Sequence, residues 1–383
     1  MRVAIVSERR ADYSRFRPIL SLMKRDRFFD VRLAVTGISL LKSHGQDIRV
    51  IKRDGFKIAV VIPMYREGVS DTGAEMTRAY GRVMAGLADF FEKVKPDVVL
   101  TGFDIGANFA AAIVGAHMNI PVAHIQGGEV TGSIDESLRH ATSKFAHIHF
   151  PATRDAAERL RRMGEDPRFI FVMGCPSLDM IRQTPQMKKA DVALMLGLDP
   201  GRPYVVILQH PVTTEATDAG RQMKETLRAV KSMRLQGVVI YPNNDAGSQA
   251  IKKEIENSGL LFVPSMSPDQ FINALRYTSA LVGNSSSGIH ETATLHVPTV
   301  NIGTRQQGRM RPANVIDVGY RTDEIRRGIR KALYDKKFLA RVRRIKNPYG
   351  DGHSARRIVG ILKKLDYKKI PIQKRFVDED PRK

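Results

Sequence analysis

The sequence predicts an α/β fold with two doubly wound, Rossmann-like domains that face each other across a cleft. Two observations favour this class. Short buried strands alternate with helices in two successive series, which is the pattern of parallel sheets with right-handed crossovers. The 383 residues also exceed what one core usually serves, and their apolar fraction of 42% is that of a globular protein.

The first series is expected to form a domain over residues 1–175. Apolar, β-branched runs predict its strands, and helical periodicity predicts helices near 14–25 and at 74–94 and 105–118. The predicted strands span residues 2–7, 31–36, 57–62, 97–101, 121–125, 146–150 and 169–173.

The second series follows residues 174–202, a stretch rich in proline, glycine and polar residues that we interpret as a linker. We expect a second domain over 176–353 and a C-terminal helix with a basic tail over 354–383. The strands of the second domain are expected at residues 204–209, 237–241, 261–263, 280–282, 299–302 and 315–318.

Composition and cysteine usage exclude several classes of protein. No run approaches the roughly eighteen apolar residues of a membrane-spanning helix, and residues 1–10 do not resemble a signal peptide. The single cysteine, Cys175, excludes an internal disulfide and a cysteine-rich metal site. We therefore expect a cytoplasmic protein without integral membrane association.

The net charge of +22 is concentrated at the two ends of the chain. Residues 1–53 carry 13 Lys and Arg against 5 Asp and Glu, and residues 321–383 carry 21 against 8. Such blocks are usually solvated surfaces, although they also attract anionic substrates, nucleic acids or membranes. No recognition motif accompanies the charge, so we expect no nucleic-acid partner.

Residues 124–140, HIQGGEVTGSIDESLRH, concentrate titratable groups between two predicted strands. Ser133 and Glu136 have the spacing of a helix-capping box, which explains two polar groups as helix initiation. Two pairs lie four residues apart on one helix face, Asp135 with Arg139 and Glu136 with His140. Ligands bind at the carboxyl ends of parallel strands, so we interpret a crowded set of charged groups here as functional. The members of this set are Glu129, Asp135, Arg139 and His140.

Four further segments follow predicted strands. The turn at 7–13 contains Arg10, whose planar guanidinium suits a phosphate, but the turn lacks the glycine pattern of dinucleotide sites and equally fits a solvated, capped turn. Asp104 either caps a helix or faces a ligand. In the second domain, His210 lies beside hydroxyl residues, and the serine-rich turn 283–291 offers amides and hydroxyls to a phosphate or simply caps a helix.

Six motifs occur in order over residues 9–358. They are RRADYS, GGEVTGSIDESLRH, HPVTTE, VGNSSSGIHE, NIGTRQQGR and NPYGDGHSARRI. Together they resemble the hydrolysing UDP-N-acetylglucosamine 2-epimerases, which have the two-domain fold of type B glycosyltransferases. The resemblance implies anti elimination of UDP to a 2-acetamidoglucal, followed by water addition that releases N-acetylmannosamine for sialic-acid-type sugars. It implies no metal and no other cofactor.

The resemblance also implies roles for individual residues. Asp104 and Asp135 are the acid/base candidates, and Arg139 supports them. His210 would hold the diphosphate, with Arg10 opposite it and Glu291 on the ribose. The remaining candidates for the diphosphate are Ser285, Ser286, Ser287, Gly288, Arg305 and Arg309.

Two positions depart from the pattern of that family. Gln126 stands where the family usually has a catalytic glutamate, and a glutamine cannot exchange a proton at neutral pH. Ala107 stands where an acidic residue is often found. Either Glu129 takes over, or a different nucleotide-linked amino sugar is used, or the elimination is redistributed between Asp104 and Asp135. The first alternative predicts that Glu129 and Asp135 are both essential.

Three other functions fit part of the pattern: a type B glycosyltransferase, a non-hydrolysing epimerase and a catalytically silent nucleotide-sugar-binding protein. The GGEVTGSIDES cluster argues against the transferase, whereas Gln126 favours the silent protein. The expected partners are a UDP-sugar substrate and further copies of the chain in a dimer or tetramer. In this architecture the last helix commonly returns to the N-terminal domain, so we expect residues 1–53 and 350–383 to form one positive face.

Overall fold

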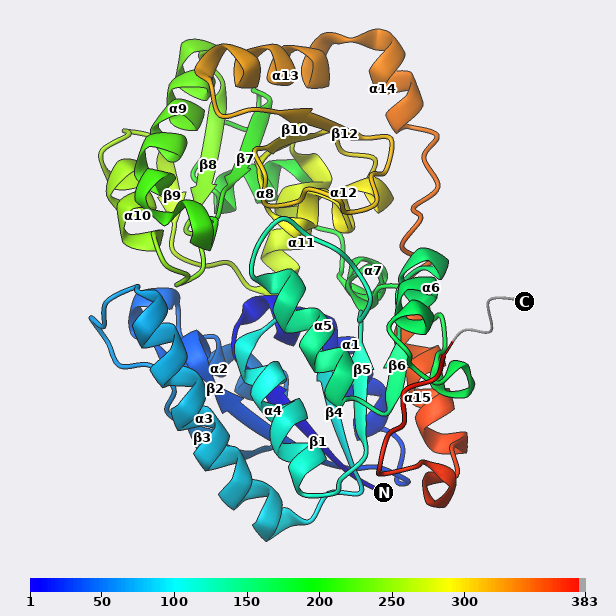
Figure 1. Ribbon diagram of the computed structural model, residues 1–383. Coiled ribbons are helices and arrows are strands. Elements are labelled where there is room, and N and C mark those ends of the chain that lie inside the picture. Colours follow the sequence, from blue (N-terminus) through cyan, green and yellow to red (C-terminus); the bar gives the residue numbers. More distant parts are fainter. Residues whose placement is uncertain (379–383) are drawn as a thin grey trace.

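The computed structural model describes residues 1–378, which form two domains, each built around a six-stranded parallel sheet (Figure 1). In spatial order the first sheet contains β3 (Ile58–Ile62), β2 (Asp30–Thr36), β1 (Arg2–Ser7), β4 (Val98–Gly102), β5 (Val122–Ile125) and β6 (Ile148–Phe150). The second contains β12 (Val315–Val318), β11 (Thr299–Ile302), β10 (Ala280–Gly283), β7 (Tyr204–Leu208), β8 (Gln236–Ile240) and β9 (Leu261–Val263). The predicted α/β class with two doubly wound domains is confirmed.

Each sheet has a switch point at which the direction of strand addition reverses. In the first sheet β1 pairs with both β2 and β4, and in the second β7 pairs with both β8 and β10. Open sheets of this kind bind ligands at the carboxyl ends of the strands beside the switch point. The Val-, Ile- and Leu-rich central strands are buried because helices cover both faces of each sheet.

Helices connect the strands as crossovers. The first domain contains α1 (Arg10–Lys24), α2 (Ile48–Arg53), α3 (Gly73–Val94), α4 (Gly106–His117), α5 (Asp135–Phe145) and α6 (Arg154–Arg162). They are followed along the chain by α7 (Pro176–Gln183), α8 (Lys189–Met195), α9 (Ala219–Ser232), α10 (Ser248–Glu256), α11 (Pro268–Tyr277), α12 (Glu291–Thr294), α13 (Thr322–Tyr334), α14 (Lys336–Val342) and α15 (Ser354–Lys364).

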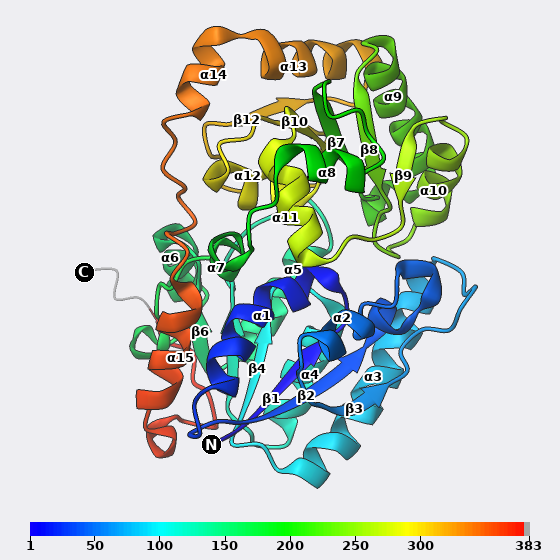
Figure 2. The same cartoon turned by 180° about the vertical axis from the view of Figure 1, so that it is seen from behind.

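The chain returns from the second domain to the first after α14, and Figure 2 shows α15 alongside α1. The apolar face of α15 is buried in the core of the first domain through Ala355, Ile358 and Leu362. The Asp179 carboxylate of α7 accepts hydrogen bonds from the backbone N–H groups of Ser354 and Ala355, both at 3.0 Å. It thereby caps the start of α15 and fixes the point of return.

Two local predictions were wrong. Residues 169–173 form no strand: a 3₁₀ turn (Pro167–Phe169) precedes a single bridge between His149 and Ile170, and much of the segment remains partly exposed. Residues 174–202 are not an open linker, because they contain α7 and α8. Most of α7 is buried, and it packs against α1 and α15. The proline and glycine content of this stretch reflects helix ends instead of a flexible connection.

The two basic ends of the chain adjoin through α1 and α15, and Lys363 of α15 forms a 2.7 Å ion pair with Asp26. Residues 379–383 of the predicted positive face lie outside the described part of the chain. The basic helices α13 and α14 lie at the opposite end of the molecule (Figure 1). In the described residues, no helix has the length and apolar character needed to cross a membrane.

Candidate active site

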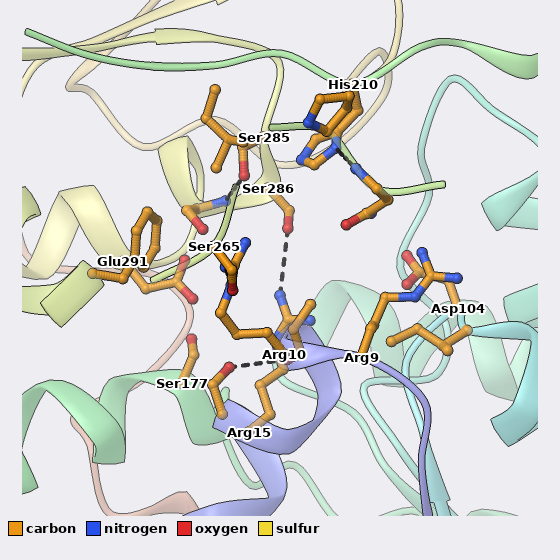
Figure 3. A pocket seen from close by; sticks show the side chains of 18 of the residues that line it. Arg9, Arg10, Arg15, Asp104, Ser177, His210, Ser265, Ser285, Ser286 and Glu291 are labelled. Carbon is orange, nitrogen blue, oxygen red and sulfur yellow. Dashed lines mark hydrogen bonds between the residues drawn. The ribbon is translucent and has the colours of Figure 1, made fainter. Parts of the chain in front are cut away.

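A cavity lies between the two domains, at the carboxyl ends of their sheets (Figure 3). Ten of the predicted site residues line it: Arg10, Asp104, Asp135, His210, Ser285, Ser286, Ser287, Glu291, Arg305 and Arg309. The other four are not part of the lining and are buried elsewhere: Gln126, Glu129, Arg139 and Gly288. The structure therefore separates the predicted residues into a layer that faces the cavity and a layer that supports it.

Asp104 follows β4 and faces the cavity instead of capping a helix. Helix α4 begins at Gly106, and its capping position, Ile105, has no side-chain hydrogen bond, so the capping interpretation of Asp104 was wrong. The carboxylate forms an ion pair with the buried guanidinium of Arg139, and that of Arg309 lies 3.9 Å away. Burial alone would raise the pKa of Asp104, but the surrounding guanidinium groups hold it below its usual range. Asp104 is therefore ionised.

Asp135 opens α5 and forms a 3.0 Å ion pair with Arg305 of the second domain. Burial raises the pKa of Asp135, and the negative charge of Asp104 raises it further, although Arg305 opposes both effects. The loop before α5 is tied to the second domain, since Gly132 donates its N–H to the Arg305 carbonyl at 2.9 Å. A side chain at position 132 would place its Cβ 2.0 Å from the Thr304 carbonyl oxygen, so only glycine fits.

The predicted capping box before α5 does not form. The Glu136 carboxylate accepts the N–H of Thr131 at 2.7 Å, and Ser133 accepts only a long contact of 3.4 Å from Asp135. Instead, this loop is hydrogen-bonded to the second domain, because the Gly132 N–H donates to the Arg305 carbonyl. The expected contact of His140 with Glu136 is present at 4.0 Å, but neither residue lines the cavity.

Gln126 and Glu129 form a buried cluster behind the cavity. The Gln126 amide donates to Glu129 at 2.9 Å, and the opposite carboxylate oxygen lies 3.3 Å from His290 Nε2 and 3.4 Å from Arg309. Burial opposes ionisation of Glu129, but His290 and the arginines hold its pKa below the usual range. With both oxygens occupied and 5% of the residue exposed, Glu129 anchors Arg309 and His290 and does not face the cavity.

In the second domain, Asn284 places His210 at the end of β7. Its side chain accepts the His210 N–H at 2.7 Å and donates to the His210 carbonyl at 2.8 Å. His210 Nδ1 accepts the N–H of Asn243 at 3.1 Å, which leaves the proton of the neutral ring on Nε2. Burial and the neighbouring cation of Arg305 hold the pKa of His210 well below its usual value. The imidazole is a neutral hydrogen-bond donor.

Sequence reasoning missed two arginines that line the cavity beside Arg10, namely Arg9 and Arg15. Figure 3 shows Arg10 and Arg15 extending from α1 into the cavity. Arg10 hydrogen-bonds to Ser265 and donates to the Met266 carbonyl at 3.3 Å, and Arg15 lies 3.4 Å from the Ser286 hydroxyl. The signal was available, because Arg15 lies four residues after Ala11, which also lines the cavity, and residues four apart share one face of a helix.

The family model for UDP-N-acetylglucosamine 2-epimerase matches residues 21–363. The chain belongs to this epimerase family. It is 35% identical to a hydrolysing UDP-N,N'-diacetylbacillosamine 2-epimerase of Legionella pneumophila, over 95% of this chain and 96% of that protein. It is 30% identical to the polysialic acid biosynthesis protein P7 of Escherichia coli, over 98% and 97% of the two chains.

Two solved structures share the fold. The UDP-N-acetylglucosamine 2-epimerase of Neisseria meningitidis, bound to UDP-N-acetylglucosamine, matches with a TM-score of 0.80 and 18% identity over 95% of this chain and all of that one. S. aureus MnaA with UDP also matches at 0.80, with 16% identity over 99% and 100% of the chains. The type B glycosyltransferase-like architecture that the resemblance implied is confirmed.

Arginines, hydroxyl groups and five carboxyls line the cavity, and two of these carboxyls, Asp104 and Asp135, have opposite pKa shifts. Five arginines line it: Arg9, Arg10, Arg15, Arg305 and Arg309. Among residues 1–378, no group of three or more His, Cys, Asp and Glu side chains is arranged to hold a metal ion. The arrangement suits an anionic ligand whose reacting part lies beside Asp104 and Asp135.

Proposed function

We propose that the protein is a hydrolysing 2-epimerase that converts a UDP-linked 2-acetamido sugar to the free 2-epimeric sugar and UDP. One observation carries the proposal: a single cavity joins two carboxyls of opposite pKa shift, Asp104 and Asp135, to a set of arginines and serines. Pairs of carboxyls whose environments separate their pKa values are typical of sites that move protons. The hydrolysing relative in Legionella pneumophila supports the same reaction.

The first step removes the proton from C2 of the sugar. The carboxylate of Asp135 takes this proton, the electron pair of the C2–H bond forms the C1=C2 double bond, and the C1–O bond breaks. The bonding pair of C1–O leaves with the β-phosphate oxygen of UDP. Asp135 suits this role because its raised pKa increases its affinity for a proton, whereas Asp104 stays an anion that fixes Arg139 and Arg309.

The second step adds water to the resulting 2-acetamidoglucal. The water oxygen bonds to C1 and the water gives up one proton to solvent, while C2 takes up a proton from solvent on the face opposite to the one that lost it. Asp135 then releases the proton it took in the first step, which restores its carboxylate. The product is a free sugar with inverted configuration at C2, and the diphosphate is not reattached. The polysialic acid biosynthesis relative supports a place in the supply of sialic-acid-type sugars.

The second domain and α1 would hold the nucleotide. Arg10, Arg15 and Ser286 lie together in the cavity, where guanidinium and hydroxyl groups stabilise the charge that develops on the departing diphosphate. His210 would donate its Nε2 proton to a phosphate oxygen, and Glu291 would accept from the ribose. The other proposed phosphate contacts are Ser285, Ser287, Arg305 and Arg309.

The experiment is incubation of the protein with UDP-N-acetylglucosamine, UDP-N,N'-diacetylbacillosamine and the GDP-linked form of the latter, followed by NMR. We expect free UDP and a free 2-epimeric sugar from at least one UDP-sugar, and no turnover with Asp135→Asn. A UDP-linked 2-epimer would indicate a non-hydrolysing epimerase. Absence of turnover with all three would contradict the proposal and favour a binding protein.

A further inference from the structure

Phe103, the residue that joins β4 to Asp104, has a left-handed backbone with φ of 69°. Such a conformation is costly for a bulky side chain and persists only where the surroundings enforce it. The Phe103 N–H donates to the Ile125 carbonyl at 2.8 Å, and its ring packs against Phe16 and Arg15. These contacts hold the ring and the amide, and the carbonyl needs its own partner because it is buried next to the cavity.

That partner is His124, a fully buried residue of β5. Its Nε2 lies 3.1 Å from the Phe103 carbonyl oxygen, and its Nδ1 lies 3.0 Å from the Ser143 hydroxyl. A carbonyl only accepts, so the proton is on Nε2 and the Ser143 hydroxyl donates to Nδ1. Burial lowers the pKa of His124 to about 3, which keeps the ring neutral. The close packing needs Gly127, whose added Cβ would lie 2.7 Å from the Ser143 oxygen.

Ser143 carries the connection into α5, the helix that begins with Asp135. It lies one turn after Arg139, whose carbonyl oxygen, 3.1 Å from the Ser143 Oγ, is the alternative acceptor for the single proton of this hydroxyl. The helix therefore contacts His124 within one turn of the guanidinium that pairs with Asp104. One imidazole thus links the strand end before Asp104 to the helix that holds Asp135 and Arg139.

The C-terminal tail completes this arrangement from outside. The Lys374 ammonium reaches the carbonyl oxygens of Ser143 and Lys144 at 3.2 and 2.8 Å, and it also contacts the Ala146 carbonyl and Glu165. A cation on the last carbonyls of a helix satisfies them and interacts favourably with the helix dipole. The far end of α5 is therefore fixed by a residue more than two hundred positions later in the sequence.

We propose that His124, Ser143 and Lys374 are positioning residues that hold Asp104, Arg139 and Asp135 in register for catalysis. His124 fixes the direction of the Phe103 carbonyl and so the backbone from which Asp104 projects, and Lys374 fixes the end of α5. The kinetic part of this inference rests on the proposed function. A displacement of about 1 Å in such groups costs on the order of 10²-fold in rate.

Two substitutions at His124 separate the two hydrogen bonds. In His124→Gln the side-chain amide nitrogen takes the place of Nε2 and keeps the bond to Phe103. In His124→Asn the side-chain amide oxygen takes the place of Nδ1, accepts from the Ser143 hydroxyl, and the bond to Phe103 is lost. We expect His124→Gln to retain kcat within about threefold and His124→Asn to lose about 10²-fold, with KM unchanged in both.

A second readout is the acidic limb of the pH profile of kcat. In His124→Asn, Asp104 is no longer aligned with Arg139, so its negative charge acts more strongly on Asp135 and the limb moves to higher pH. Lys374→Met should also lower kcat, and Lys374→Arg should restore it. Equal activity of His124→Asn and wild type, or equal loss in both His124 variants together with weaker UDP binding, would overturn the inference.

Hydrogen exchange tests the positioning independently of turnover. We expect His124→Asn to speed exchange of the amides at residues 103–106, and Lys374→Met to speed exchange at residues 143–146, while UDP affinity measured by calorimetry stays unchanged. If the wild type turns over no UDP-sugar, the proposed function fails while these exchange rates still decide the positioning role. Unchanged exchange in both variants would contradict it.

Discussion

Asp104 and Asp135 face the same cavity, yet their pKa values shift in opposite directions. Burial penalises the charge of both residues. Arg139 and further arginines outweigh that penalty at Asp104, whereas at Asp135 the charge of Asp104 adds to it and Arg305 compensates only in part. One carboxyl is thereby kept as a permanent anion and the other is prepared to exchange a proton.

This relationship predicts two opposite shifts in the pH profile of kcat/KM. A base must be ionised, so activity falls as the pH drops through the pKa of Asp135, which lies above the ordinary value for aspartate. Arg305→Gln removes a cation that lowers this pKa, so the acidic limb should move to higher pH. Asp104→Asn removes an anion that raises it, so the limb should move to lower pH in the residual activity. Movement of both variants in one direction would contradict the assignment.

Gln126 is predicted to be a structural partner of Glu129. Its amide donates to the Glu129 carboxylate at 2.9 Å, and its carbonyl accepts from the Cys175 thiol. Gln126→Glu would replace the donor by a second buried carboxylate, which should destabilise the protein by about 1–3 kcal/mol in urea unfolding. A variant that is as stable as the wild type and more active would instead mean that a catalytic glutamate had been lost at this position.

Glu129 is predicted to matter through its anchoring of Arg309 and His290. Glu129→Gln keeps the volume but removes the charge that both partners face, so kcat/KM should fall by at least about tenfold as Arg309 shifts. The hypothesis that Glu129 takes over proton transfer predicts in addition that the acidic limb of the pH profile disappears. Steady-state kinetics across pH distinguish the two, and near wild-type turnover would contradict both.

Arg15 is predicted to bind the diphosphate. Arg15→Gln removes the positive charge and should weaken UDP binding by about 10- to 100-fold, because hydrogen bonds to charged groups contribute about 1.5–3 kcal/mol. Calorimetric titration with UDP measures this change. A matched control is Arg25→Gln, an exposed arginine just beyond α1, which should leave the affinity unchanged. Equal affinities for wild type and Arg15→Gln would remove Arg15 from the site.

Stability at acid pH is predicted to depend on Glu165, which is buried beside His149 and forms an ion pair with the partly exposed Lys374. Burial opposes its charge, but these partners lower its pKa to about 2. The unfolded state therefore binds more protons as the pH falls from about 4.5 toward 2, and stability is lost across that window. Glu165→Gln should reduce this dependence and cost about 3–5 kcal/mol at neutral pH, as measured by urea unfolding.

The alternation of strands and helices was sufficient to predict the twelve strands of the described residues to within two residues at each end. It also placed Asp104 and His210 just after strands and Asp135 at the start of a helix. Local pattern failed where contacts distant in sequence decide the structure. The capping box predicted at Ser133 does not form, and the neighbouring Gly132 N–H is hydrogen-bonded to the Arg305 carbonyl of the second domain. The strand expected at 169–173 makes only one bridge to the sheet, between Ile170 and His149. The left-handed residue Phe103 carries no sequence signal, because its conformation is imposed by β5 and α5.

The burial of Glu129 could not be predicted either. Its neighbours in sequence suggest a cavity-facing acid, but His290 and Arg309 come from the second domain and engage it behind the lining. Conversely, the position of Asp135 in the first turn of α5 was sufficient to place it at the cavity. Residues next to the switch point of one sheet are predictable, whereas those at the contact of two domains depend on the docking of both.

The central claim is that Asp135 moves the C2 proton of a UDP-sugar that is then hydrolysed. Turnover in D₂O, followed by proton NMR, tests it most directly. We predict free UDP and a free 2-epimeric sugar in which one deuterium has replaced the C2 proton, with no product from Asp135→Asn. Release of a free sugar that retains its C2 proton, or unimpaired deuterium incorporation by Asp135→Asn, would contradict the account.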